Sequence, residues 1–269
     1  MLILTSAPMA ILAAENYQTK LWAIKQKGHI KGYLLGTIHI PKHNIWRDVY
    51  GLPDVLDTEV KRVIFEIRFD VVLRIPGGCN SFGHLKDQGL KSTINQISGN
   101  SIHDDTSLWI IYFSLIKKLY RIIPWNPIFE HQIYEQVISK GLRHYYLDEP
   151  QQLIQRFNRV PIIELELAIR EVLTYISKKN AGTFSMDQVI QEYWSGESAR
   201  KVHSNTGMSQ FIKIMIFERS RQWLPNIIGH LNAESTLIVV GAAHLNGQQG
   251  LIQLLSDKGY ELTPVTNME

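Results

Sequence analysis

The chain contains one cysteine, Cys79, among 269 residues. A single cysteine excludes an intrachain disulfide and a zinc site built from cysteine thiolates. Its neighbours, Gly77-Gly78 and Asn80-Ser81, are typical of a loop, with no helix start behind the thiol to activate it. We therefore do not expect Cys79 to act as a nucleophile. The G-x-S-x-G pattern of serine hydrolases is also missing, which favours activated water over covalent catalysis.

A strong excess of charge of either sign is missing too. The formal net charge is +3 at pH 7, and basic residues occur singly or in pairs such as Lys117-Lys118 and Lys178-Lys179. Nucleic-acid-binding proteins concentrate Lys and Arg in a patch or stripe. We expect no nucleic-acid partner, and we place these lysine pairs on solvated helix faces.

Long hydrophobic runs are few. The run from Leu108 to Ile116 covers nine residues, about half of what a membrane-spanning helix needs. We therefore expect no transmembrane span.

The N-terminal segment, residues 1–14, is apolar apart from Thr5 and Ser6. Its end, Ile11-Leu12-Ala13-Ala14, is similar to the small-residue cleavage site of an export signal, although no positively charged segment precedes it. The segment is either the remnant of a signal or a buried N-terminal segment. We expect export to the periplasm or cell envelope, with a cytoplasmic location as the alternative.

The remaining residues, 15–269, read as a single α/β domain with a helical insertion. The chain is 45% hydrophobic, which is enough for a full core, and no Pro-, Gly- or Ser-rich linker divides it. Apolar patterns predict strands over Lys20–Ile24, Lys31–Ile38, Arg62–Ile67, His144–Leu147, Thr236–Val240 and Tyr260–Val265. They predict helices over Asp48–Val60, Phe129–Ser139, Ile162–Ile176, Met186–Trp194, Met208–Ile228 and Leu251–Lys258, one capped by Thr106 or Ser107, and one that starts at Asp148. Pro225 should kink or end the helix in which it lies.

Two of these strands end in the same short pattern. Gly36-Thr37-Ile38-His39 follows one apolar run, and Gly241-Ala242-Ala243-His244 follows another, 205 positions later. Glycine allows a sharp exit from a strand because it has no Cβ. Open α/β sheets bind ligands at the carboxyl ends of their strands. We therefore expect the two histidines to form one site.

Three charged residues can be assigned from their context. Glu66 lies within the strand predicted over Arg62–Ile67, which looks buried on both faces, and a carboxylate there is costly unless it meets a cation, a metal or several donors. The alternative is that Glu66 lies at the exposed end of the strand. Asp148 precedes a helix and is expected to cap it. Arg219 lies beside Glu218, and such a pairing is by itself typical of a surface network.

Two histidines and a glutamate supply three metal ligands and leave positions open for water. A bound ion would lower the pKa of that water and polarise a carbonyl, which makes hydrolysis possible at neutral pH. Manganese, cobalt and zinc all suit imidazole and carboxylate ligands. Without a metal, a histidine paired with a glutamate can serve as a general base. The simplest alternative is that each histidine only caps its own turn.

The chain resembles the TraB/GumN/PrgY family, which includes the Tiki metalloproteases. The resemblance is carried by Gly36 to His39, by Phe65-Glu66, and by Gly241-Ala242-Ala243-His244-Leu245-x-Gly247. Phe129 to Phe157 and Phe217-Glu218-Arg219 match further patterns of the family. It implies a mixed β-sheet built from two related α/β halves, each with a strand and a G-x-x-H unit, and a mostly helical middle insertion.

The resemblance also implies a site and an activity. His39, Glu66 and His244 would bind a divalent metal and carry catalysis, with Arg219 as a supporting site residue. Two positions depart from the family: Ser220 stands where asparagine is usual, and Asp148 where glutamate is usual. The implied activity is metal-dependent hydrolysis of a peptide or protein in the cell envelope.

Three functions remain open on the sequence. The first is a metal-dependent peptidase, and the second is a metal-free esterase that uses a histidine base. The third is a non-catalytic protein that captures a peptide or signal in the same cleft.

Overall fold

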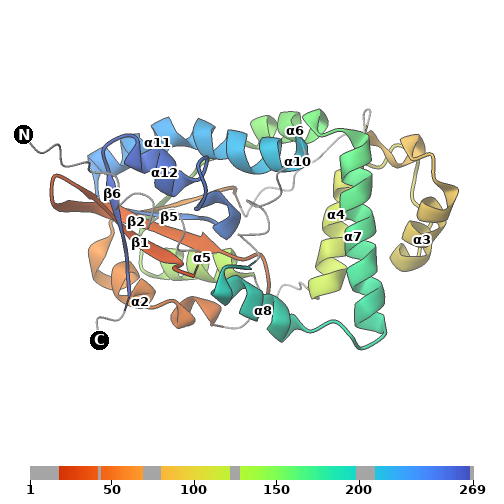
Figure 1. The fold of residues 1–269 in the computed structure, drawn as a ribbon, viewed down its shortest axis with the longest axis horizontal. Helices are drawn as coiled ribbons and strands as arrows, with labels where there is room; N and C mark the ends of the chain where they lie inside the picture. Colours follow the sequence, from red (N-terminus) through yellow and green to blue (C-terminus); the bar gives the residue numbers. More distant parts are fainter. Residues whose placement is uncertain (1–17, 42–43, 69–79, 122–127, 198–209, 267–269) are drawn as a thin grey trace, which may run out of the picture.

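The computed structural model describes residues 18–41, 44–68, 80–121, 128–197 and 210–266. Its centre is a six-stranded sheet in the order β4-β3-β5-β2-β1-β6 (Figure 1). All strands run in the same direction except β1, which is antiparallel to both of its neighbours. The mixed α/β class expected from the sequence is confirmed. The strands are β1 (Leu21–Gln26), β2 (His29–Thr37), β3 (Arg62–Phe65), β4 (Arg143–Tyr146), β5 (Thr236–Gly241) and β6 (Glu261–Pro264).

The first two predicted strands are present as β1 and β2, which pair as an antiparallel hairpin. Its turn residues, Lys27 and Gly28, have positive φ angles of 52° and 78°. Two successive residues in this region form the tight turn whose twist matches that of the strands. The hairpin leads β2 directly toward the first histidine motif.

Strand β5 lies in the middle of the sheet, between β2 and β3. Each of its six residues is buried. Leu237 and Val239 pack on one face of the sheet, whereas Ile238 and Val240 pack on the other. Burial on both faces explains the uninterrupted apolar run, which is typical of parallel strands covered by helices.

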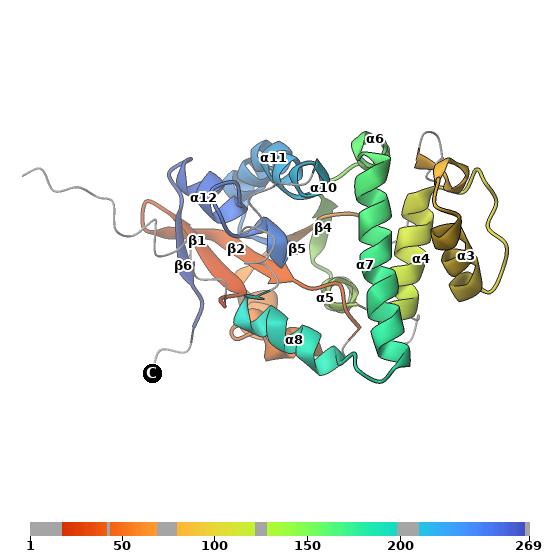
Figure 2. The same cartoon turned by 45° about the vertical axis from the view of Figure 1, so that its right-hand side comes forward.

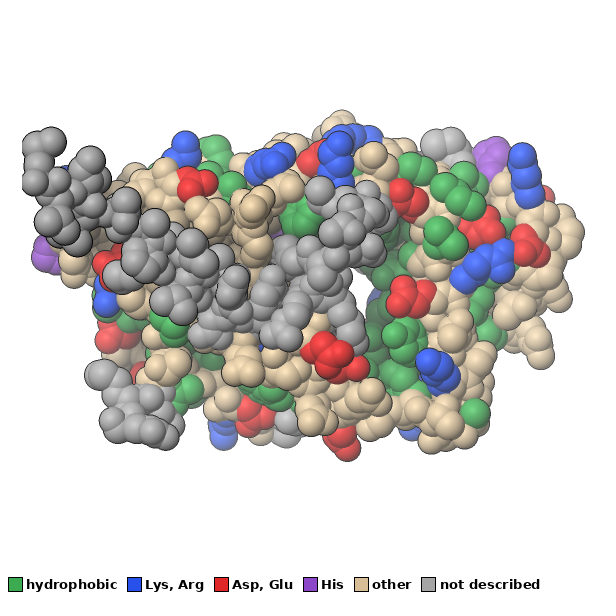
Figure 3. Space-filling model, viewed as in Figure 1, with side chains coloured by type: hydrophobic (Ala, Val, Ile, Leu, Met, Phe, Trp, Pro, Cys, Tyr) green, Lys and Arg blue, Asp and Glu red, His purple; other side chains and the backbone are tan. Residues whose placement is uncertain are grey.

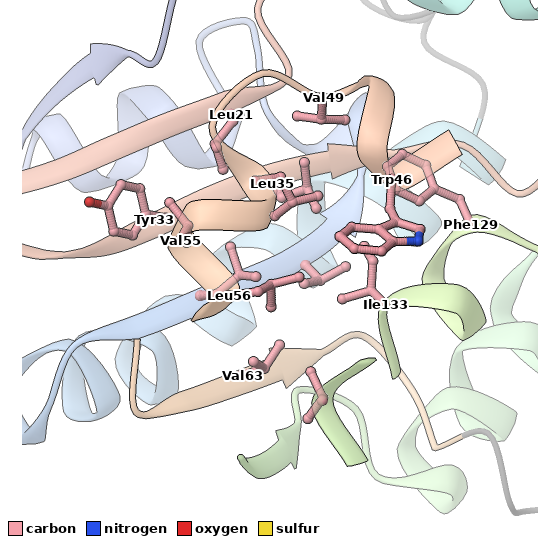
Figure 4. Packing of buried hydrophobic residues seen from close by; sticks show 14 of the residues in the cluster. Leu21, Tyr33, Leu35, Trp46, Val49, Val55, Leu56, Val63, Phe129 and Ile133 are labelled. Atoms are coloured by element: carbon pink, nitrogen blue, oxygen red, sulfur yellow. The ribbon is translucent and has the colours of Figure 1, made fainter. Parts of the chain in front are cut away.

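Helices cover both faces of the sheet (Figure 1). On one face lie the 3₁₀ turn Ile45–Asp48 and three helices, and Figure 4 shows Trp46, Phe129 and Ile133 packing against Leu35 there. On the other face, Trp223 and Ile227 pack against strand residues that include Trp22. The first face carries α2 (Leu52–Asp54), α5 (Phe129–Ser139) and α8 (Met186–Ser195), and the second carries α11 (Arg219–Ala233) and α12 (Leu251–Ser256).

A helical layer stands beyond one end of the sheet (Figures 1 and 2). Its core is separate from those of the two sheet faces and is centred on Trp109, whose ring stacks on Phe157 at 4.4 Å and on Phe211 at 5.5 Å between centroids. This layer is the predicted helical insertion. It contains α3 (Gln88–Ser98), α4 (Leu108–Tyr120) and α7 (Ile162–Asn180), and it meets α6 (Pro150–Arg159) and α10 (Gln210–Ile212).

Two predicted helices differ in the structure. The segment predicted as a helix over 48–60 consists of a 3₁₀ turn, the short α2 and a π-helical turn at Val55–Glu59. The break is at Gly51, where φ is 75°. The helix predicted over 208–228 contains a π-helical turn at Lys213–Glu218, and α11 continues through Pro225 to Ala233. Burial of the residues on both sides of Pro225 outweighs the local cost of the proline.

The last strand also pairs differently from a simple β-α-β unit. Strand β6 runs parallel to β5, but it pairs with β1 at the edge of the sheet, so α12 crosses over two intervening strands. None of the described helices is both long and apolar enough to cross a membrane. On the face drawn in Figure 3, Lys and Arg side chains lie singly or in small groups among acidic ones.

Candidate functional site

The two histidine motifs lie side by side because β2 and β5 are paired in parallel. Gly36 is opposite Val240, and Thr37 is opposite Gly241. Beyond Thr37 the chain continues to His39, and beyond Gly241 it enters a 3₁₀ turn that ends at His244. The sheet therefore brings together histidines that are 205 positions apart.

Gly241 marks the point where the motifs meet. A Cβ atom added there would lie 3.3 Å from Glu66 Oε1, 3.6 Å from His39 Nε2 and 3.9 Å from His244 Cδ2. The backbone does not need glycine for its conformation, because φ is −57° and ψ is 139°. Glycine here leaves open a space that the three predicted site residues border.

Glu66 is buried directly after β3, so the prediction of a buried, partnered carboxylate is confirmed over the exposed alternative. Its Oε1 accepts a 2.5 Å hydrogen bond from the backbone N–H of Gly241, and its Oε2 accepts a 2.8 Å bond from Arg219 Nη2. Burial alone would raise the pKa of Glu66. The charges of Arg219, His244 and His39, with the Gly241 N–H, outweigh burial and lower that pKa to about 2.

Arg219 lies in the site and not in a surface network. Its side chain is 8% exposed, and its Nε donates to Asp148 Oδ2 at 2.9 Å. Its Nη1 donates to the carbonyl oxygen of Met215 at 3.1 Å, in the π-helical turn that precedes α11. The guanidinium thus ties Glu66, Asp148 and the start of α11 together.

The expectation that Asp148 caps a helix is wrong. Glu149 occupies the N-cap position of α6, whereas the buried Asp148 carboxylate accepts hydrogen bonds from three side chains. Arg156 donates at 2.6 Å and Trp223 at 3.0 Å, in addition to Arg219. The Asp148 backbone N–H also donates to the carbonyl of Glu66 at 2.8 Å, which places the ends of β3 and β4 together.

His244 is buried beneath the site. Its Nδ1 lies 2.9 Å from Ser220 Oγ, its Nε2 lies 3.7 Å from Glu66 Oε1, and its ring is 4.5 Å from that of Trp223 between centroids. Burial lowers the pKa of His244 to about 4. The imidazole is therefore neutral near pH 7, the form in which histidine binds metals.

His39 lies at the open side of the site, with 61% of its side chain exposed. Its Nδ1 is 2.9 Å from Glu130 Oε1. The negative charge of Glu130 raises the pKa of His39 to about 9. The two histidines thus have opposite surroundings, one paired with a carboxylate at the surface and one buried beside a hydroxyl.

Sequence reasoning missed Glu130. This residue is 5% exposed in the first turn of α5, and its Oε1 also accepts a short hydrogen bond from the Thr37 hydroxyl. Its Oε2 is buried and has no hydrogen-bond partner in the part of the chain that the structure describes. An acidic residue in the first turn is commonly explained by the helix dipole, so the sequence held no distinct signal for this role.

The sequence model of the TraB/PrgY/gumN family matches residues 119–264, more than half of the chain. The chain belongs to this family. The matched part of this TraB/PrgY/gumN protein contains Glu130, Asp148, Arg219 and His244, whereas His39 and Glu66 precede it. No curated protein and no solved structure matches the chain.

The donor types of this TraB/PrgY/gumN site suit a divalent cation, since two imidazoles and a carboxylate border the space over Gly241. Within the described residues, no group of three or more His, Cys, Asp and Glu side chains is arranged to hold a metal ion as it stands. Side-chain adjustment would be needed to complete a ligand set, and the exposed His39 has the most freedom to provide it.

Proposed function

We propose that this protein is a metal-dependent hydrolase that cleaves peptides or proteins. The observation that carries the proposal is the shared space over Gly241, bordered by His39 Nε2, Glu66 Oε1 and the ring of His244. These groups come from the ends of three neighbouring strands, the position at which α/β sheets bind ligands.

His39, Glu66 and His244 would hold the cation, with manganese, cobalt or zinc as its identity. When bound there, a divalent ion supplies a water of lowered pKa and polarises the carbonyl to be cleaved. Membership of the TraB/PrgY/gumN family and the donor types support this set.

The other residues of the site hold these donors in place. Arg219 and the Gly241 N–H each occupy one oxygen of Glu66, so the carboxylate stays ionised and has a fixed orientation. Asp148 in turn accepts a hydrogen bond from Arg219, and Arg156 holds Asp148 in place. His39 remains accessible to solvent, and we place the substrate on the side of the site where His39 lies.

A metal-free hydrolase is the second candidate, because His39 and Glu130 form a base with an orienting carboxylate. The raised pKa of His39 limits this mechanism, since a group with a pKa of about 9 is mostly protonated at neutral pH. Such an enzyme would gain activity as the pH rises through about 9 and would tolerate chelators.

Metal binding and turnover should be measured on the same preparations. We expect about one manganese, cobalt or zinc ion per chain, cleavage of an unstructured protein or peptide library, and inhibition by a chelator that is reversed by added metal. The variants His39→Ala, Glu66→Gln and His244→Ala should lose the ion while remaining folded. His103→Ala, which removes an exposed histidine outside the site, is the matched control.

Other outcomes would separate the alternatives. Turnover that resists chelators and rises with pH would identify the metal-free base. Peptide binding without turnover, preserved in both histidine variants, would identify a non-catalytic capture protein. Location in the cell envelope belongs to the same proposal and is tested by fractionating cells that express the full chain.

A further inference from the structure

We propose that Ser220 and Glu130 are positioning residues that accept a hydrogen bond from Nδ1 of His244 and of His39, so that Nε2 is the nitrogen that each ring presents to a cation. A proton carried by His39 Nε2 in the metal-free protein would leave as the cation binds. The inference rests on the proposed function, because it concerns the same pair of histidines. It adds two residues whose part in the site had no separate assignment.

The tautomer of His244 follows from the single proton of the Ser220 hydroxyl. Ser220 Oγ lies 2.9 Å from the carbonyl oxygen of Ile216 and 2.9 Å from His244 Nδ1. A carbonyl can only accept, so the hydroxyl proton goes to Ile216. Ser220 Oγ must then accept from His244, and the proton of the neutral ring lies on Nδ1.

The orientation of His39 follows from a carboxylate. Glu130 Oε1 faces His39 Nδ1 at 2.9 Å and also lies beside the Thr37 hydroxyl, whose single proton can go to Glu130 or to the carbonyl oxygen of Val240. An ionised carboxylate has no proton to give, so His39 Nδ1 must be the donor. His39 Nε2 then faces the space over Gly241, 3.6 Å from the position of a Cβ added to that glycine.

Both positioning residues are buried. Ser220 is 0% exposed, and Glu130 is 5% exposed with no partner for its Oε2 among the described residues. A buried oxygen without a partner costs free energy, which is not expected of a residue retained only for stability. The Ser220 hydroxyl and the Glu130 carboxylate orient their histidines in the same way, because each presents an acceptor to Nδ1. This is the usual arrangement around metal-binding histidines.

The assignment of Ser220 can be tested directly by nitrogen-15 NMR of the histidine rings, recorded on the metal-free protein at neutral pH. We expect His244 to carry its proton on Nδ1. In Ser220→Ala the preference should be lost, and in Ser220→Thr, which keeps the hydroxyl, it should return. Ser114→Ala is the matched control, because Ser114 also donates to the carbonyl four residues before it but contacts no histidine.

Affinity for manganese and zinc alone, measured by calorimetry, tests both assignments. Loss of such an orienting partner typically weakens metal binding by about 10- to 100-fold, and we expect this for Ser220→Ala and Glu130→Gln. Ser114→Ala and Glu135→Gln, a neutralisation of an exposed residue on the same helix as Glu130, should leave the affinity unchanged. Urea unfolding of each variant separates loss of binding from loss of fold.

The outcomes are distinct. A proton on His244 Nε2 in the wild type, or unchanged tautomer and affinity in Ser220→Ala, would overturn the assignment of Ser220. Unchanged affinity in Glu130→Gln would overturn that of Glu130. If the tautomer is as expected and responds to Ser220→Ala but no cation binds, the positioning role of Ser220 stands and the proposed metal-dependent function fails.

Discussion

Arg219 donates a 2.8 Å hydrogen bond to Glu66 across 153 positions of sequence, and the same Nη2 atom lies 2.8 Å from Asp148 Oδ2. One guanidinium therefore bonds two buried carboxylates that follow neighbouring strands, and Arg156 supplies a second cation for Asp148. Without Arg219, the buried Glu66 would lose its arginine partner, so the stability of the candidate site depends on Arg219.

Replacement of Arg219 by methionine should lower the free energy of unfolding by about 3–5 kcal/mol, the usual cost of leaving a buried charge without its partner. The control is Arg143→Met. Arg143 pairs with Glu234 at the surface, where its side chain is 53% exposed, and such exposed pairs contribute little to stability. Urea unfolding measures both. Equal losses in the two variants would contradict the role given to Arg219.

The two histidines should titrate far apart in metal-free protein. NMR titration should give a pKa of about 9 for His39 and about 4 for His244. In Glu130→Gln the pKa of His39 should fall toward its ordinary value of 6.5. Because the pKa is raised on folding, the His39–Glu130 pair stabilises the protein fully below about pH 6.5, and this contribution is lost as the pH rises through about 9. Titration of both rings near 6.5 would refute the assignment.

Gly241→Ala should fill the space between the three donor groups. The backbone angles suit alanine, but its Cβ would lie 3.3 Å from Glu66 Oε1. We expect a stability cost of no more than about 1–3 kcal/mol and a loss of metal affinity. Calorimetry with manganese or zinc measures the second effect.

Gly229→Ala is the control for that substitution. Gly229 lies inside α11, and apart from its own helix backbone no atom of the described residues lies within 4 Å of an added Cβ. Alanine there should stabilise the protein by about 0.5–1 kcal/mol and leave metal binding unchanged. A metal affinity that fell equally in both glycine variants would show that the space over Gly241 is not the binding site.

Tyr193→Phe should loosen the end of β2. The Tyr193 hydroxyl donates to the carbonyl of Gly36 at 2.6 Å, and the residue is 2% exposed. Phenylalanine would remove this hydrogen bond from the buried Gly36 carbonyl. The free energy of unfolding, measured with urea, should fall by about 1–3 kcal/mol. Tyr175→Phe, at a tyrosine that is 40% exposed, should change stability by less than about 0.5 kcal/mol. Equal effects would argue against the Gly36 contact as the cause.

The sequence predicted the strands of the site well, because local pattern and burial agree there. The apolar runs before Gly36 and Gly241 become β2 and β5. The strand predicted over Arg62–Ile67 is present but ends at Phe65, so Glu66 comes directly after it. Helix α5 begins and ends as predicted, at Phe129 and Ser139. The assignment of residues 15–269 to a single domain stays a prediction, and residues 1–14 and Cys79 lie outside the described residues.

What the sequence could not supply were interactions between distant residues. Asp148 has the sequence context of a helix cap, yet its carboxylate accepts hydrogen bonds from arginines of α6 and α11 instead. Glu130 looks like a first-turn acid, and Ser220 looks like an ordinary helix residue until His244 is placed beside it. The π-helical turn before Arg219 left no recognisable pattern either, since it depends on how the helix packs.

The position of β5 has a consequence for how the protein is made. Without β5, the β1–β2 hairpin and the β3–β4 pair share no hydrogen-bonded edge, because β5 alone joins them within the described sheet. A nascent chain that ends before Thr236 would carry two half-sheets, each with an open apolar edge of the kind that promotes aggregation. The candidate site would be absent from such a chain as well. The candidate site would thus form only after β5, the strand that leads to His244, has been made.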